Sequence, residues 1–131
     1  MNMVPPGTHK KLIVFYGENR EELLCSEENM LDLLKGASIA SGATIVKEIA
    51  HGFCGGGGVT AVVILSESSA SGHSWPENDG YAEFDIFTCG DHCDPQKGLD
   101  FIIETTKPKE IYLLIDVPRT KSNIREEVKE V

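Results

Sequence analysis

The chain has 131 residues, of which 40% are hydrophobic and 25% charged, and its formal net charge is −9 at pH 7. This is the size and composition of one globular domain, and no apolar run approaches the about 20 residues of a membrane-spanning helix. The acidic balance argues against nucleic acid as a partner, because phosphate binding needs clustered lysine and arginine.

The first half of the sequence predicts a strand, a helix and two further strands. Residues 12–16 (LIVFY) form a short apolar run that is typical of a buried strand. Ser26 followed by two glutamates marks a helix N-terminus, and an apolar stripe continues the helix toward Gly42. Residues 43–53 and 59–65 are β-branched runs, and the glycines at 55–58 predict a hairpin connection between them.

The second half predicts a strand, a helix and a last strand. Residues 81–88 (YAEFDIFT) alternate between apolar and acidic side chains, so one face of this strand should meet solvent. Asp94 followed by Pro95 marks the start of a second helix, whose apolar stripe is Leu99, Ile102 and Ile103. Residues 111–117 (IYLLIDV) predict the last strand, and the polar segment from Pro118 onward should be loose.

These elements give the order βαβββαβ within a single domain of residues 1–131. Two helices that return the chain to one sheet fit an α+β fold. We expect a two-layer sandwich with a mainly antiparallel sheet and both helices on one of its faces.

The four cysteines, at positions 25, 54, 89 and 93, have no CxxC spacing and predict reduced thiols rather than a disulfide framework. The N-terminal segment MNMVPPGTHKK has no basic stretch leading into an apolar run with a cleavage site, so no secretory signal is expected. Together these features predict a cytoplasmic protein.

Three short motifs resemble known sites but lack a required residue. The glycine run at 55–58 precedes a strand instead of a helix and holds no phosphate-binding fingerprint. In GHSWP, Pro76 occupies the place of the last glycine of a hydrolase nucleophile elbow. The segment TCGDHCD lacks the second ligand pair of a structural zinc site, although it offers Cys89, Asp91, His92 and Cys93. The sequence therefore predicts no metal site.

The segment after the strand at 59–65 is rich in catalytic side-chain types. SESSASGHSWPE (66–77) contains serines, a histidine and carboxylates, and FTCG ends the next predicted strand with a thiol. The motifs SES (66–68), HSWPE (73–77), GYA (80–82), DIFTCG (85–90) and DP (94–95), in this order, resemble the prokaryotic S-adenosylmethionine decarboxylases. The resemblance extends to SGATIV (41–46) and HGF (51–53), and it covers about residues 8–117.

The resemblance implies a proenzyme that makes its own cofactor from Ser68. The Ser68 hydroxyl would attack the carbonyl carbon of Glu67, while His73 and Thr60 move protons and stabilise the oxyanion. Elimination of the resulting ester would split the chain into residues 1–67, the β chain, and residues 68–131, the α chain, which would begin with a pyruvoyl group. No external cofactor would then be needed.

The resemblance also implies how a small-molecule substrate is held and decarboxylated. The pyruvoyl ketone would form a Schiff base with the amine of S-adenosylmethionine and take up the electron pair left by carbon dioxide. Cys89 would return a proton to the α-carbon. Phe53 and Trp75 would sandwich the adenine, and Glu77 would accept hydrogen bonds from the ribose. Family members are dimers whose sheets pack face to face, so a homodimer of processed protomers is expected.

The chain departs from the family pattern at four places. Thr60 stands where the family usually has a serine, and its stiffer side chain should slow processing. Ser69 replaces a histidine and Gly72 replaces a larger apolar residue, which should loosen the segment after Ser68. One residue is inserted in WPENDGYA and shifts Glu77, and the glycine run after Phe53 is longer than usual.

Three hypotheses about function remain open on the sequence alone. The first is a pyruvoyl-dependent decarboxylase of S-adenosylmethionine that supplies spermidine biosynthesis, and Trp75 and Glu77 favour it. The second keeps the cofactor and takes arginine or ornithine as substrate. The third is an uncleaved homologue that binds a ligand or a partner and catalyses nothing.

Overall fold

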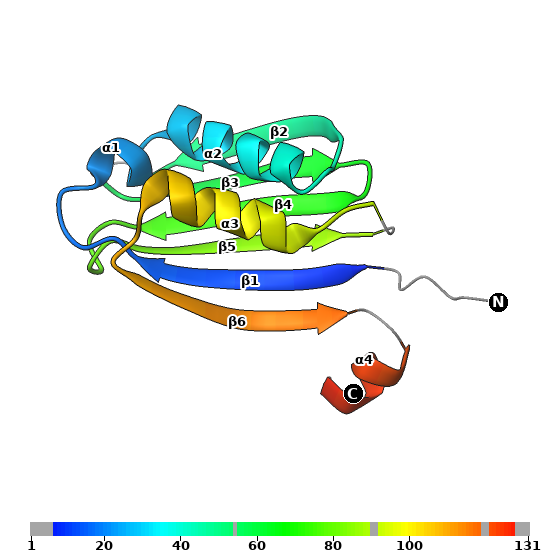
Figure 1. Cartoon of the computed structure of the whole chain (residues 1–131). Coiled ribbons are helices and arrows are strands. Elements are labelled where there is room, and N and C mark those ends of the chain that lie inside the picture. The colour runs from blue at the N-terminus through cyan, green and yellow to red at the C-terminus, as the bar shows by residue number, and fades with distance from the viewer. Residues whose placement is uncertain (1–6, 54, 90–91, 119–120, 128–131) are drawn as a thin grey trace.

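The computed structural model describes residues 7–53, 55–89, 92–118 and 121–127. Six strands form one sheet in the order β2-β3-β4-β5-β1-β6, and each pair of neighbours is antiparallel. The helices α2 and α3 lie side by side across the same face of this sheet and leave the opposite face open (Figure 1). The two layers are therefore a sheet and a pair of helices.

The elements have the following bounds. The strands are β1 (Thr8–Phe15), β2 (Ile45–Gly52), β3 (Val59–Leu65), β4 (Ser68–Trp75), β5 (Tyr81–Thr88) and β6 (Glu110–Pro118). The helices are α1 (Glu21–Leu24), α2 (Glu27–Ala40), α3 (Pro95–Thr106) and α4 (Lys121–Glu127).

The predicted fold class, an α+β sandwich with an antiparallel sheet and helices on one face, is confirmed. The predicted order βαβββαβ is wrong in one respect, because it lacks β4, which pairs with β3 on one side and β5 on the other. The short helix α1 was also not predicted, and the segment expected to be loose after Pro118 contains α4.

The two long helices begin where the sequence predicted. The Ser26 hydroxyl accepts a hydrogen bond from the backbone N–H of Asn29 at 3.0 Å, and the Asp94 carboxylate accepts one from the backbone N–H of Gln96 at 3.0 Å. Each cap satisfies a backbone donor that a helix N-terminus leaves without an intrahelical partner. Both helices are thereby fixed at their first turns.

Alternation along the strands separates a buried face from an open face. In β5, the apolar Ala82, Phe84 and Ile86 point to the helices and are fully buried, whereas Glu83 and Asp85 lie on the open face and are half-buried. The core lies between the sheet and the helices, and Met30, Leu34, Leu99 and Ile102 fill its helix side. Among the described residues, no helix has the length and apolar character needed to span a membrane.

Candidate active site

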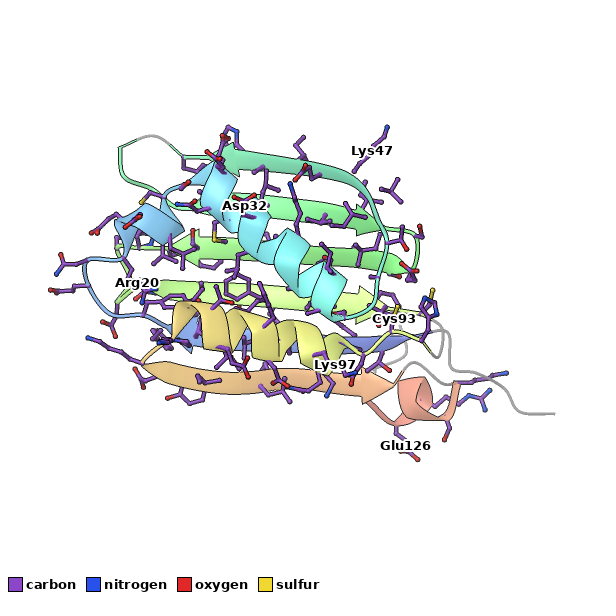
Figure 2. The ribbon with its side chains drawn as sticks, turned by 45° about the horizontal axis from the view of Figure 1, so that its top comes forward. Arg20, Asp32, Lys47, Cys93, Lys97 and Glu126 are labelled. Carbon is purple, nitrogen blue, oxygen red and sulfur yellow. The ribbon has the colours of Figure 1, made fainter. Side chains whose placement is uncertain are left out.

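The residues expected to act together lie in two groups at opposite ends of the sheet. We call the first group, Glu67, Ser68 and Cys89, the turn cluster, because it sits where β3 turns into β4 and where β5 ends. The second group, the pocket cluster, lies where β3 begins and β4 ends, and it consists of Phe53, Thr60, His73, Trp75 and Glu77. Figure 2 marks the two ends, with Cys93 at the turn-cluster end and Arg20 at the other.

The turn cluster holds the Glu67–Ser68 peptide in an unusual conformation. Leu65 pairs with Ser68, so only Ser66 and Glu67 form the turn between β3 and β4. Ser68 has a φ of 152°, which is costly for a residue with a side chain. The carbonyl oxygen of Glu67 accepts a hydrogen bond from the backbone N–H of Cys89 at 2.8 Å. This hydrogen bond polarises the Glu67 carbonyl, and it would stabilise an oxyanion formed on that carbonyl.

The Glu67 side chain anchors the turn. One carboxylate oxygen accepts a hydrogen bond from the backbone N–H of Thr44 at 2.9 Å, and the other lies 3.1 Å from Nε2 of His92. The hydrogen bond from Thr44, followed by that from His92, lowers the pKa of Glu67 below its ordinary value. The carboxylate is therefore ionised at neutral pH and fixes the residue whose carbonyl would be attacked.

Cys89 and Cys93 flank this turn on the segment between β5 and α3. Both thiols are half-buried, and both are free. Burial raises the pKa of the Cys93 thiol, and the charges of Glu67 and Cys89 raise it further. Cys93 is therefore protonated at neutral pH, and its Sγ lies 3.6 Å from the carbonyl oxygen of Gly42.

The pocket cluster lines one cavity of about 290 Å³ together with Gly57, Gly58 and Ser74. Phe53 and Trp75 are 55% and 39% exposed, which is high for aromatic side chains of this size and leaves part of each ring accessible. Within the cavity, Thr60 Oγ1 lies 3.2 Å from Nδ1 of His73, and the two residues face each other across β3 and β4. The His73 and Trp75 rings are stacked with centroids 6.1 Å apart.

The walls of this cavity depend on one buried hydroxyl and one glycine. Ser74 accepts a hydrogen bond from the backbone N–H of Val59 at 2.9 Å and donates one to the carbonyl oxygen of Leu24 at 2.6 Å. Gly58 lies so close to the Ser74 carbonyl that a β-carbon would not fit. Gly58 therefore packs its backbone directly on β4, and Phe53 is held over the cavity by a hydrogen bond from its backbone N–H to the Gly58 carbonyl at 2.9 Å.

The residue inserted after Glu77 is accommodated in the turn between β4 and β5. Asp79 and Gly80 both adopt positive φ there, at 55° and 64°, and the Gly80 carbonyl accepts a hydrogen bond from Tyr16 at 2.9 Å. Glu77 still lines the cavity. The expected shift of Glu77 thus leaves its side chain beside Trp75.

The structure does not bring Ser68 and His73 together within one chain. The two residues are separated by five positions of extended strand, a distance of about 16 Å. His73 and Thr60 consequently cannot exchange a proton with the Ser68 hydroxyl of the same protomer. Their expected role in processing requires another way of meeting Ser68.

Three contributors to the turn cluster were not found by sequence reasoning. Thr44 and His92 hold the Glu67 carboxylate, and the backbone N–H of Cys89 contacts the Glu67 carbonyl. Thr44 carried no signal, because it acts through its backbone. His92 was noted only as a metal ligand, and its pairing with Glu67 depends on the placement of β4 beside β5.

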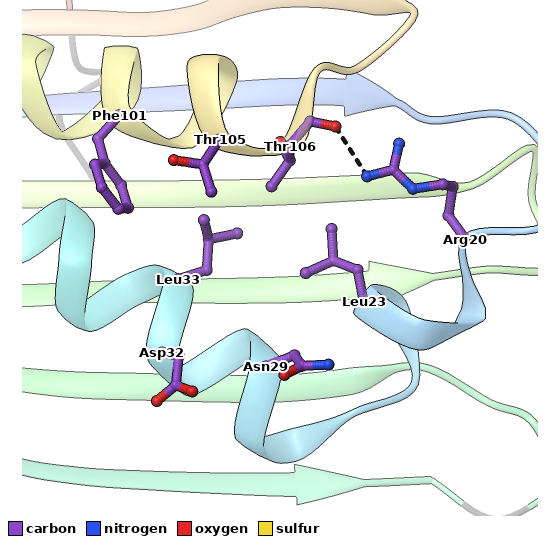
Figure 3. Close-up of a pocket in the computed structure, with 8 residues that line it drawn as sticks. All are labelled: Arg20, Leu23, Asn29, Asp32, Leu33, Phe101, Thr105 and Thr106. Atoms are coloured by element: carbon purple, nitrogen blue, oxygen red, sulfur yellow. Dashed lines mark hydrogen bonds between the residues drawn. The ribbon is translucent and has the colours of Figure 1, made fainter.

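A second cavity, of about 310 Å³, lies between α1, α2 and α3 on the helix side of the molecule (Figure 3). Its lining includes Arg20, which donates a hydrogen bond to the carbonyl oxygen of Thr106 at 2.8 Å. It shares no residue with the turn cluster or the pocket cluster and is not part of the candidate site.

Comparison with known proteins places this arrangement in a family. Residues 10–117 match the family model described as S-adenosylmethionine decarboxylase. The chain is 37% identical over 89 residues to the S-adenosylmethionine decarboxylase proenzyme of Pyrobaculum arsenaticum, covering 68% of this chain and 70% of that one. It is also 37% identical over 108 residues to the proenzyme of Thermotoga maritima, covering 82% of this chain and 80% of that one.

A solved structure agrees with the sequence relatives. The adenosylmethionine decarboxylase from Aquifex aeolicus VF5 is 28% identical and matches 90% of this chain and 92% of that one with a TM-score of 0.76. The matched residues include the strands that carry the turn cluster and also the strands that carry the pocket cluster. From these matches and this fold, the chain belongs to the S-adenosylmethionine decarboxylase family.

Proposed function

We propose that the protein is a self-processing, pyruvoyl-dependent decarboxylase of S-adenosylmethionine, whose product serves spermidine biosynthesis. The observation that carries the proposal is the strained Ser68 placed directly after a carbonyl that accepts a 2.8 Å hydrogen bond from Cys89. The cytoplasmic location expected from the sequence belongs to the same proposal, and the free thiols of Cys25, Cys89 and Cys93 support it.

Self-processing starts with attack of the Ser68 oxygen on the carbonyl carbon of Glu67. The peptide C–N bond breaks as the ester C–O bond forms, and the Ser68 hydroxyl proton passes to the freed amine. Loss of the Ser68 α-proton then expels the Glu67 carboxylate as the new C-terminus of residues 1–67. The dehydroalanine left at position 68 takes up water and releases ammonia, which leaves a ketone at the start of residues 68–131.

The residues around Ser68 fit a pyruvoyl group at position 68. The cofactor supplies a ketone that binds the substrate amine and accepts the electron pair left when carbon dioxide departs. Cys89 follows the strand paired with Ser68 and is half-buried, so its thiol is available as the proton donor to the α-carbon. Phe53 and Trp75 offer accessible ring faces for an adenine, and Glu77 offers a hydrogen-bond acceptor for ribose hydroxyls.

We further propose that two copies of the chain form a homodimer in which each active site is shared. Because the turn cluster and the pocket cluster lie at opposite ends of the sheet, one protomer alone does not assemble the site. A two-fold axis that lies between two stacked sheets and crosses their strands at right angles would bring opposite ends together. Ser68 of one protomer would then meet His73 of the partner subunit, twice per dimer.

The open face of the sheet supports this packing. It carries large apolar side chains, among them Ile49, Ile64 and Tyr112, which are 69%, 47% and 52% exposed. Charged residues of β1 and β5 on this face already have partners: Lys11 lies 3.6 Å from both Glu83 and Asp85, and other bonds join His9 to Asp85 and Tyr81 to Glu83. The bond to Glu83 raises the pKa of Tyr81 to about 12. A face with paired charges can be covered at a lower desolvation cost.

An assay of carbon dioxide release tests the substrate. We expect the purified, cleaved protein to decarboxylate S-adenosylmethionine and to leave arginine and ornithine unchanged, because the aromatic pocket has no role for either amino acid. Trapping of the ketone with phenylhydrazine should abolish the activity. Release from the basic amino acids alone would contradict the assignment of S-adenosylmethionine, and full activity of an uncleaved chain would contradict the cofactor.

Truncation of Trp75 tests the adenine site. We expect Trp75→Ala to raise the KM for S-adenosylmethionine by about 10- to 100-fold, the usual effect of losing one base-stacking aromatic. The value of kcat should change less, since Trp75 is assigned to the adenine and not to the reacting atoms. The measurement is initial-rate kinetics on cleaved material, with Trp75→Phe as the control that keeps a ring. An unchanged KM in Trp75→Ala would remove Trp75 from the binding site.

A further inference from the structure

Three different metal-ligating side chains meet beside the Glu67–Ser68 peptide. A carboxylate oxygen of Glu67, a ring nitrogen of His92 and the Sγ of Cys93 all lie within 4.8 Å of one another. Glu67 comes from the turn between β3 and β4, whereas the other two precede α3. The pairing of β4 with β5 brings the two segments together, so the set is not visible as a sequence motif.

The segments that carry these ligands are held by hydrogen bonds to other parts of the backbone. One oxygen of Glu67 accepts a hydrogen bond from the Thr44 N–H, and the other, 3.1 Å from Nε2 of His92, would exchange that contact for the cation. The segment of His92 and Cys93 is fixed by a 2.9 Å hydrogen bond from the Asp94 N–H to the Ser41 carbonyl. The Glu67 side chain is only 12% exposed, which shields one side of the cluster from water.

The donor set discriminates between cations. Thiolate, imidazole and carboxylate together suit zinc and similar borderline-soft divalent ions, whereas calcium and magnesium prefer oxygen ligands alone. Bond lengths of 2.0–2.3 Å put neighbouring ligands of tetrahedral zinc about 3.3–3.8 Å apart. The three ligand atoms are at most 4.8 Å apart here. Side-chain rotations that move them by about an ångström would therefore bring them to these distances.

We propose that Glu67, His92 and Cys93 bind one zinc ion, with the fourth position open to water. This differs from the sequence prediction of no metal, which considered His92 and Cys93 but not Glu67 as a ligand. Binding requires Cys93 as thiolate, so one proton is released to solvent for each cation bound. The site is separate from the pocket cluster and uses none of its residues.

The position of the site links it to processing, and this part rests on the proposed self-cleavage. Glu67 would end one fragment, while His92 and Cys93 belong to the other, so the cation would span the broken bond. Cleavage also creates a new α-carboxylate on Glu67, a ligand residue. An added negative charge within several ångströms of a divalent cation should tighten its binding by about tenfold.

Titration with cobalt(II) tests the site, since cobalt replaces zinc and a cobalt–thiolate bond gives a charge-transfer absorption. We expect one cobalt per chain with this absorption in the wild type. Cys93→Ser should lose the band, and His92→Ala should bind about 100-fold more weakly. Cys25→Ser removes another half-buried thiol at a distance from the cluster. This variant should keep both the absorption band and the cobalt affinity of the wild type. Binding that survives Cys93→Ser, or no binding by the wild type, would overturn the proposal.

A comparison of cleaved wild type with the Ser68→Ala chain separates the two claims. We expect cobalt to bind both forms and to bind the cleaved form about tenfold more tightly. Equal affinities would overturn the link to cleavage. If the wild type is never cleaved, the proposed function fails, and the titration of the intact chain still decides whether the metal site exists.

Discussion

Replacement of Ser68 by alanine should leave the polypeptide whole at 131 residues and without decarboxylase activity. In the proposed mechanism the Ser68 hydroxyl attacks Glu67, and alanine lacks it, so neither the ester nor the ketone could form. It keeps the β-carbon, and therefore adopts the φ of 152° at a cost similar to that of serine. The variant should thus fold, and the loss should be complete rather than partial.

Mass spectrometry under denaturing conditions measures this result directly. The wild type should give two species, residues 1–67 and residues 68–131 with a ketone at the front, and Ser68→Ala should give one intact chain. Ser69→Ala is the matched control, because it removes the neighbouring hydroxyl from the same strand and should be cleaved like the wild type. If Ser68→Ala is cleaved, or if Ser69→Ala is the one variant of the two that is not cleaved, the reaction belongs to another residue.

Elements with strong local patterns could be predicted from the sequence, and β5 and β3 begin and end where the pattern placed them. β5 alternates and β3 runs through large apolar residues, and such patterns can be recognised without knowing which elements pack against them. The caps of α2 and α3 were likewise predicted, because Ser26 and Asp94 act on the first turn of their own helices.

Strand β4 was missed because its buried positions hold small residues. Ala70, Gly72 and Ser74 face the helices, and the space above Gly72 is filled by Met30 and Phe84, whose side-chain atoms would lie 3.1–3.2 Å from an added β-carbon. The large side chains that complete this part of the core come from other elements. A local pattern of serines and glycine therefore indicated a loop where tertiary packing forms a strand.

The sequence proposed which residues form the site, but it could not place them in the fold. The resemblance predicted that His73 acts at Ser68, whereas an extended strand separates the two residues by about 16 Å within one chain. The same missed strand hid the contacts of Glu67 with Thr44 and His92. Once β4 is placed, the distribution of the site over two ends of the sheet follows from the strand bounds.

Co-expression of Ser68→Ala and His73→Ala chains should restore activity that neither variant has alone. In a mixed dimer, the His73→Ala chain supplies an intact Ser68 and the Ser68→Ala chain supplies an intact His73. If these two residues meet across the interface, one of the two sites is complete and is cleaved. With equal amounts and random pairing, half of the dimers are mixed, so about one quarter of wild-type activity should return.

The masses of the fragments make the result specific. Position 73 lies in residues 68–131, so every ketone-bearing fragment in the mixture should carry alanine at that position. A site built within one protomer predicts the opposite, since no chain in the mixture has both Ser68 and His73, and neither cleavage nor activity would return. Restored activity therefore requires a dimer with shared sites. The length of β4 separates Ser68 from the pocket cluster within each chain, so only the partner's pocket cluster can reach Ser68.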